Sequence, residues 1–130
     1  MAKLKLPDGI KVKQTQYKKL FNVWVTIKEQ LKLTQEILDC YAVTELSDDR
    51  LRLVIFGFSF QVAFVHNFKL GQVVYIRDAE GDSISETLVT INFDEKGKLG
   101  EPYNAYAVKD FSLVNLNVLD SITSVSRLVK

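Results

Sequence analysis

Histidine and cysteine, the residues most often used for acid–base and nucleophilic catalysis, each occur once in the sequence, as His66 and Cys40. A catalytic triad or a histidine general base would have to use His66, which ends an aromatic segment just before Asn67-Phe68. No Gly-x-Ser-x-Gly nucleophile motif accompanies it. The sequence therefore predicts a histidine at a strand end, with no catalytic residues assigned.

Acidic residues around a predicted turn offer a second kind of chemistry. Asp94-Glu95-Lys96 follows one strand-like segment, and Asp78, Glu80 and Asp82 precede it. Two carboxylates and a lysine in this order loosely resemble the site of restriction-type nucleases, and the resemblance implies bound Mg²⁺ and a lysine that positions the attacking water. The same residues also form ordinary turns without a metal. We therefore assign no metal ligands and rank a metal-dependent nuclease third among the functions.

Glycine-rich loops that hold the phosphates of a nucleotide cofactor are absent from the sequence. The six glycines are scattered at predicted turns, at positions 9, 57, 71, 81, 97 and 100. No cofactor is predicted.

An uneven distribution of charge is the most distinctive feature of the sequence. Residues 1–33 contain eight lysines and two acidic residues, a balance of +6, whereas the rest of the chain contains nine basic and fourteen acidic residues, a balance of −5. Such asymmetry indicates an anionic partner. The candidate residues for binding it are Lys3, Lys5, Lys11, Lys13, Lys18 and Lys19. Lysines also protect sheet edges from aggregation and can pair with the acidic part of the same chain, so these alternatives stay open.

A hairpin followed by a helix would position these lysines. Residues 3–6 and 10–13 alternate lysine with apolar residues around Pro7-Asp8-Gly9, which predicts a two-stranded ribbon with all four lysines on one side. From Thr15, a plausible N-cap, the apolar spacing becomes helical and predicts a helix to about residue 37. Its apolar stripe consists of Tyr17, Leu20, Phe21, Trp24, Ile27, Leu31 and Leu38.

The middle of the chain predicts an antiparallel meander. The expected strands cover residues 37–46, 51–66, 72–77 and 84–93, and residues 93–99 form a hairpin with Gly97 at positive φ. In the long segment Gly57 would be a bend or bulge, and one face would carry Phe56, Phe58, Phe60, Val62 and Phe64. These aromatic residues, with those of the helix, are expected to fill the core, and a ligand pocket between helix and sheet is the alternative.

The end of the chain predicts a second helix over residues 108–130, because its apolar residues recur at helical spacing. Its β-branched and small polar residues leave a strand over residues 113–119 as the alternative. The expected fold class is α+β: a long N-terminal amphipathic helix packed on a meandering antiparallel sheet of about five strands, with a C-terminal helix.

Length and composition bound the class of protein. The sequence has 130 residues, 47% of them hydrophobic and 25% charged, which fits a single globular domain. The longest apolar run covers the six residues 53–58, far short of the roughly twenty that a membrane span needs. A lone cysteine excludes intrachain disulfides and favours a cytoplasmic location.

The leading hypothesis is a non-enzymatic interaction module that binds another macromolecule, with a protein ranked first. Its role would be that of an inhibitor, an immunity protein or a chaperone. This hypothesis rests on an analogy of architecture: small inhibitors, immunity proteins and secretion chaperones also combine a helix with a meander and lack catalytic residues. The alternative is a nucleic-acid-binding protein that uses the basic N-terminal face. A homodimer formed through a sheet edge stays open, and no membrane association is expected.

Overall fold

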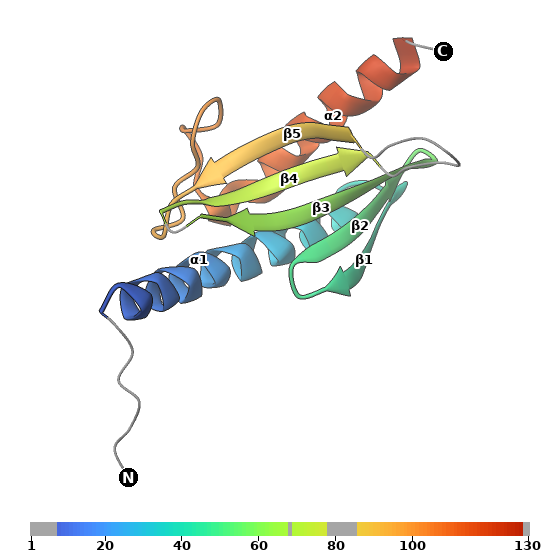
Figure 1. Ribbon diagram of the computed structural model, residues 1–130. Helices are drawn as coiled ribbons and strands as arrows, with labels where there is room; N and C mark the ends of the chain where they lie inside the picture. Colours follow the sequence, from blue (N-terminus) through green and yellow to red (C-terminus); the bar gives the residue numbers. More distant parts are fainter. Residues whose placement is uncertain (1–7, 68, 78–85, 129–130) are drawn as a thin grey trace.

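Two helices and one five-stranded sheet form the part of the chain that the computed structural model describes, residues 8–67, 69–77 and 86–128 (Figure 1). Helix α1 (Asp8–Leu33) continues into a short 3₁₀ helix, η1 (Thr34–Glu36). A second 3₁₀ helix, η2 (Val108–Asp110), leads into helix α2 (Phe111–Leu128). The expected α+β fold, with helices at both ends of an antiparallel sheet, is confirmed, and the alternative of a strand over residues 113–119 is wrong.

The five strands follow one another in the sheet in the same order as in the sequence. They are β1 (Tyr41–Ser47), β2 (Arg50–Ile55), β3 (Phe58–His66), β4 (Gly71–Arg77) and β5 (Glu86–Phe93). Each pairs antiparallel with its neighbours, as a meander requires. The predicted hairpin after β5 is also present, with Gly97 at φ 85° and the Asp94 N–H bonded to the Lys98 carbonyl at 3.0 Å.

Helix α1 begins earlier than the sequence predicts. Residues 10–13, expected to form the second arm of a lysine-faced hairpin, lie within α1, so the hairpin prediction is wrong for this arm. The first arm, residues 3–6, lies outside the described residues. Once a helix has formed, each added residue gains a hydrogen bond at low entropic cost, whereas an isolated two-stranded ribbon is marginally stable in water. The helical period of the following residues therefore overrides the local alternation.

The segment 51–66 is two strands and not one. Phe56 and Gly57, at φ 50° and 82°, form a two-residue turn between β2 and β3, and Ile55 pairs with Phe58 directly across it. Positive φ at both central residues is typical of the type I′ turn, which matches the twist of the adjoining strands. Phe56 is therefore at a hairpin tip and half exposed, and its predicted place on the core face is wrong.

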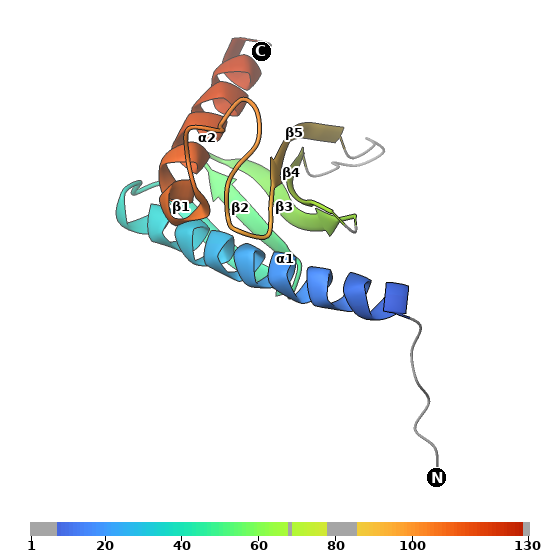
Figure 2. The same ribbon diagram turned by 90° about the vertical axis from the view of Figure 1, so that its left-hand side faces the viewer.

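The core lies between the sheet and the two helices. Figures 1 and 2 show α1 and α2 on the same side of the sheet. The helical stripe Leu20, Trp24, Ile27 and Leu31 is fully buried there, together with alternate residues of the strands. Among them Phe60, Val62 and Phe64 confirm the face that the sequence predicts for β3. Neither helix in the described part of the chain has the length and hydropathy of a membrane span.

A small polar cluster joins α2 to the rest of the core. The side-chain amide of Asn115, which is fully buried, accepts a 2.7 Å hydrogen bond from Tyr75 and donates to Tyr41 and Thr34 at 3.1 and 3.2 Å. Burial raises the pKa of both tyrosine hydroxyls above the ordinary value. Because each polar group in the cluster has a partner, the cluster specifies how α2 is placed against β1, β4 and η1.

Candidate interaction surfaces

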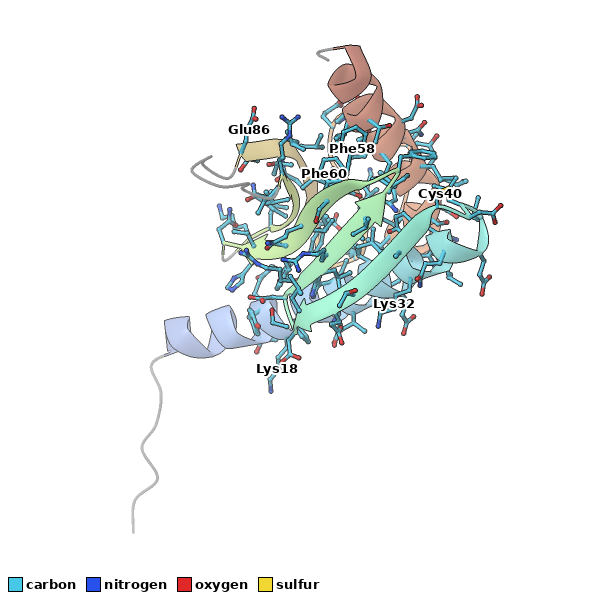
Figure 3. All side chains as sticks on the ribbon, turned by 90° about the vertical axis from the view of Figure 1, so that its right-hand side faces the viewer. Lys18, Lys32, Cys40, Phe58, Phe60 and Glu86 are labelled. Carbon is cyan, nitrogen blue, oxygen red and sulfur yellow. The ribbon has the colours of Figure 1, made fainter. Side chains whose placement is uncertain are left out.

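The four candidate lysines that fall within the described residues do not share one face of α1. Lys3 and Lys5 lie outside the described residues, and Lys11 and Lys13 lie in the first turns of α1, where only the backbone is described. Lys18 and Lys19 are exposed further along the helix. Figure 3 shows Lys18 and Lys32 on α1. At about 100° per residue, positions 11 and 18 are nearly aligned, 19 lies about 80° away, and 13 lies on the opposite side.

Acidic side chains from the rest of the chain approach two of the helix lysines. Glu95, after β5, accepts a 3.1 Å hydrogen bond from Gln16 and lies 3.8 Å from the Lys19 ammonium. Lys28 donates to Glu45 of β1 at 3.1 Å, and this hydrogen bond lowers the pKa of the Glu45 carboxyl. Part of the positive charge of α1 is thus neutralised by carboxylates of the same chain. This pairing is one of the alternatives that the sequence leaves open.

His66 is the last residue of β3 and is exposed. Its ring stacks on Phe64 at a centroid distance of 5.5 Å and meets Tyr17 of α1 edge-on at 4.6 Å. Tyr17 itself is 40% exposed, although the sequence placed it on the buried stripe. An exposed aromatic pair therefore lies beside the lysine-bearing helix.

In the acidic hairpin after β5, the side chain of Asp94 stabilises the turn. Asp94 Oδ1 accepts hydrogen bonds from the backbone N–H groups of Lys96 and Lys98, both at 2.9 Å, which closes the turn. Asp78, Glu80 and Asp82 lie outside the described residues. Within the described ranges no three His, Cys, Asp or Glu side chains form a group that could hold a metal ion.

A shallow groove of about 330 Å³ runs between α1, the hairpin after β5 and η2. Lys19, Glu95 and Lys96 contribute its charged groups, and Val23 and Val108 its apolar ones. Glu95 already pairs with Lys19 and Gln16, so among these lining residues only the charge of Lys96 lies outside that pair, and a single exposed ammonium selects no particular ligand. The aromatic residues of α1 and β3 pack against one another in the core, as the sequence predicts.

The opposite side of the sheet, which we call the open face, is not covered by α1 or α2 (Figure 1). The strand registers place on it Ala42, Thr44, Ser47, Arg50, Arg52, Val54, Ser59, Gln61, Ala63, Val65, Gln72, Val74, Ile76, Thr87, Thr90 and Asn92. None of these residues is lysine, aspartate or glutamate. The open face therefore combines β-branched aliphatic groups, amides and hydroxyls with two arginines.

Cross-strand hydrogen bonds hold several polar side chains of the open face in place. Arg50 donates to the Gln61 side chain at 2.8 Å, and Gln72 donates to Asn92 at 3.0 Å. Val54 and Val65 are 37% and 47% exposed between these polar groups. Side chains that are fixed before binding lose less entropy when a partner docks, so this surface is suited to recognition.

The two edges of the sheet are partly occupied by the chain itself. The side chain of Gln35 accepts the outward N–H of Val43 in β1, at 3.4 Å. At the other edge, the N–H of Gly100 donates to the Asn92 carbonyl of β5 at 2.8 Å. Groups that occupy edge positions hinder pairing with another strand, so the homodimer through a sheet edge, which the sequence left open, gains no support from these positions.

No family model matches the sequence, and no curated protein and no solved structure is similar to it at a significant level. Residues 51–66 were interpreted from the sequence as one long segment with a bend or bulge at Gly57, so the open face was not predicted. A glycine between two apolar alternating runs is the signal that could have located the turn at Phe56-Gly57.

Proposed function

We propose that this protein is a non-enzymatic interaction module that binds another protein through the open face of its sheet. The observation that carries the proposal is the composition of that face: arginine without lysine or carboxylates, set among valine, isoleucine, threonine and amide side chains. Arginine is enriched in protein interfaces, whereas lysine, aspartate and glutamate are depleted. The single cysteine supports a cytoplasmic place of action.

The same composition favours a protein over a nucleic acid at this site. Base recognition on a sheet surface relies on aromatic side chains that stack on bases, and the registered residues of the open face include none. Exposed Val54 and Val65 gain from contact with apolar atoms of a partner. Arg50 and Arg52 match carboxylates geometrically, because a guanidinium can donate two parallel hydrogen bonds.

Nucleic-acid binding by α1 is the second candidate function, and one observation favours it. Exposed Tyr17 and His66 lie in edge-on contact, and position 17 is about 40° from the lysine at position 13 around the axis of α1. Aromatic rings beside cations are typical of single-strand binding. We rank it second because Lys19 and Lys28 are already close to carboxylates.

A capture experiment with two charge-reversal variants tests the proposal. The tagged protein, Arg52→Glu and Lys18→Glu are each used to recover bound molecules from cells of the native source, with and without nuclease. Both substitutions reverse one exposed charge, Arg52 on the open face and Lys18 on α1, and circular dichroism checks that each variant is folded.

We expect at least one protein that the parent chain and Lys18→Glu retain and that Arg52→Glu loses. Its recovery should not change with nuclease. If Lys18→Glu loses the bound material, and nuclease releases it, the second candidate function replaces the first.

A further inference from the structure

Phe56 combines an unusual backbone conformation with an exposed aromatic side chain. It has φ 50°, which L-residues with large side chains rarely adopt, and its side chain is 50% exposed. Asparagine or glycine is the usual residue at the first central position of a type I′ turn, and Gly57 at the second position follows the rule. Turn propensity alone would therefore favour a different residue at position 56.

A second exposed apolar side chain lies on the strand that leads into this turn. Val54, two residues before Phe56, is 37% exposed on the open face, and Ile37, in the segment before β1, is 54% exposed. The register Tyr41–Ile55–Phe58 brings the start of β1 next to the Phe56-Gly57 turn. Figure 3 shows Cys40 and Phe58 at this end.

We infer that Phe56 is the anchor residue of the proposed interface, and that it inserts into an apolar pocket of a partner protein whose border carries carboxylates. This inference rests on the proposed function of the open face. Aromatic residues that fill a pocket contribute much of the binding energy of protein interfaces. Arg52 lies four residues before Phe56, which is about 13 Å along an extended strand. This distance is shorter than the width of a standard protein interface, so one partner can contact both residues.

Charge complementarity argues for this partner over a second copy of the chain. If two open faces met, Arg50 and Arg52 of one copy would approach a surface that offers arginine and no carboxylate. An acidic border on a different protein can accept hydrogen bonds from both guanidinium groups. Local strain at a functional residue is a recognised feature of binding sites, which agrees with the positive φ at Phe56.

Site-specific photo-crosslinking tests the inference, because it captures whichever molecule lies against a chosen position. Phe56→p-benzoylphenylalanine keeps an aromatic side chain at the hairpin tip and forms a covalent bond with its neighbour on illumination of living cells. The matched control places the same amino acid at Tyr17, an exposed aromatic residue on α1.

We expect a discrete protein adduct from position 56 that is absent from position 17 and is lost when Arg52→Glu is added to the same chain. An adduct with the mass of two copies would overturn the inference in favour of self-association. A nuclease-sensitive adduct, or the absence of any adduct from position 56, would also overturn it.

Phe56→Asn provides the second measurement. Asn-Gly is a favoured type I′ sequence, so relief of the unfavourable φ should offset the lost ring contacts and keep Tm within about 3 °C of the parent value. The crosslinked protein, once purified, should bind this variant roughly 30-fold more weakly. Unchanged binding would reject the anchor role of Phe56, and if Arg52→Glu still abolished binding, the proposed function would stand without it.

Discussion

The hydroxyl of Tyr75 donates a 2.7 Å hydrogen bond to Oδ1 of Asn115, in a site where both side chains are fully buried. Forty positions separate the two residues in the sequence. The bond therefore links the centre of the sheet to the C-terminal helix, and the amide nitrogen of Asn115 extends the link to Thr34 and Tyr41. Burying such a group is favourable only when its partners are present.

Replacing Asn115 by leucine should destabilise the fold strongly. The side chain keeps about the same volume but leaves the hydroxyls of Tyr75, Tyr41 and Thr34 without the amide, and each buried polar group that loses its partner costs about 1–3 kcal/mol. Because Thr34 keeps its hydrogen bond to the Gln30 carbonyl, two hydroxyls lose their partner, and we expect a total loss of about 2–6 kcal/mol in the free energy of unfolding, measured by urea denaturation. Asn117→Leu, on the exposed side of α2, is the control and should change it by less than about 0.5 kcal/mol. Equal effects would show that the cluster does not hold α2.

Trp24 should behave as a core residue. It is fully buried, stacks on Phe64 at 5.7 Å, and donates a 2.8 Å hydrogen bond from Nε1 to the Asp48 carbonyl. Trp24→Ala should cost about 3–5 kcal/mol of stability, whereas Tyr17→Ala on the exposed part of the same helix should cost much less. Since Trp24 is the sole tryptophan, its fluorescence gives a direct check. Emission typical of water-exposed indole in the folded protein would contradict its burial.

Elements with a clear period and clear turn residues were predictable from the sequence. The apolar stripe of α1 around Trp24 and the hairpin at Gly97 are both found as predicted. In each case local pattern and long-range packing favour the same structure. The C-terminal helix followed from spacing alone, although its β-branched residues lower helix propensity, because packing against the core decides the outcome.

Two features were not predictable by the same rules. Residues 10–13 alternate as a strand would, but the helix that follows extends through them. Phe56 is hydrophobic and does not mark a turn, so Gly57 was interpreted as a bend or bulge and not as the reversal that separates β2 from β3. Without that reversal the open face, with Arg50 and Arg52 side by side with Gln61 and Ala63, could not be constructed. The candidate site therefore depends on strand register, which a single sequence does not specify here.

Alkaline pH should unfold the protein through Tyr41 and Tyr75. Burial raises the pKa of both hydroxyls in the folded state, so above the ordinary tyrosine pKa of about 10 the unfolded chain loses protons that the folded chain keeps. Their contribution to stability is complete below about pH 10 and falls above it, by roughly 1.4 kcal/mol per pH unit for each tyrosine. Urea denaturation at a series of pH values measures the slope. Tyr41→Phe should reduce the slope of unfolding free energy against pH by the contribution of one tyrosine. An unchanged slope would show that Tyr41 ionises equally in the folded and unfolded states.

Binding of labelled random-sequence DNA should be weak and should depend only moderately on salt. Phosphate contacts by lysines release counterions, so log affinity falls with log salt by about 0.9 for each contact. If all six candidate lysines touched one duplex the slope would be about −5, but the helix groups only positions 11, 18 and 19 in one sector, which predicts a slope of about −3.

Single substitutions on α1 distinguish these two arrangements. Lys18→Gln should flatten the slope by about one unit, whereas Lys13→Gln, on the opposite side of the helix, should leave it unchanged. At roughly 0.15 M salt we expect dissociation constants weaker than about 1 μM, because lysines without arginine supply attraction but few directed contacts. A slope near about −5 that both substitutions reduce equally, with binding tighter than about 1 μM, would mean that the lysines act as one surface. In that case nucleic-acid binding by α1, and not protein binding by the open face, would be the better account of the charge asymmetry in this chain.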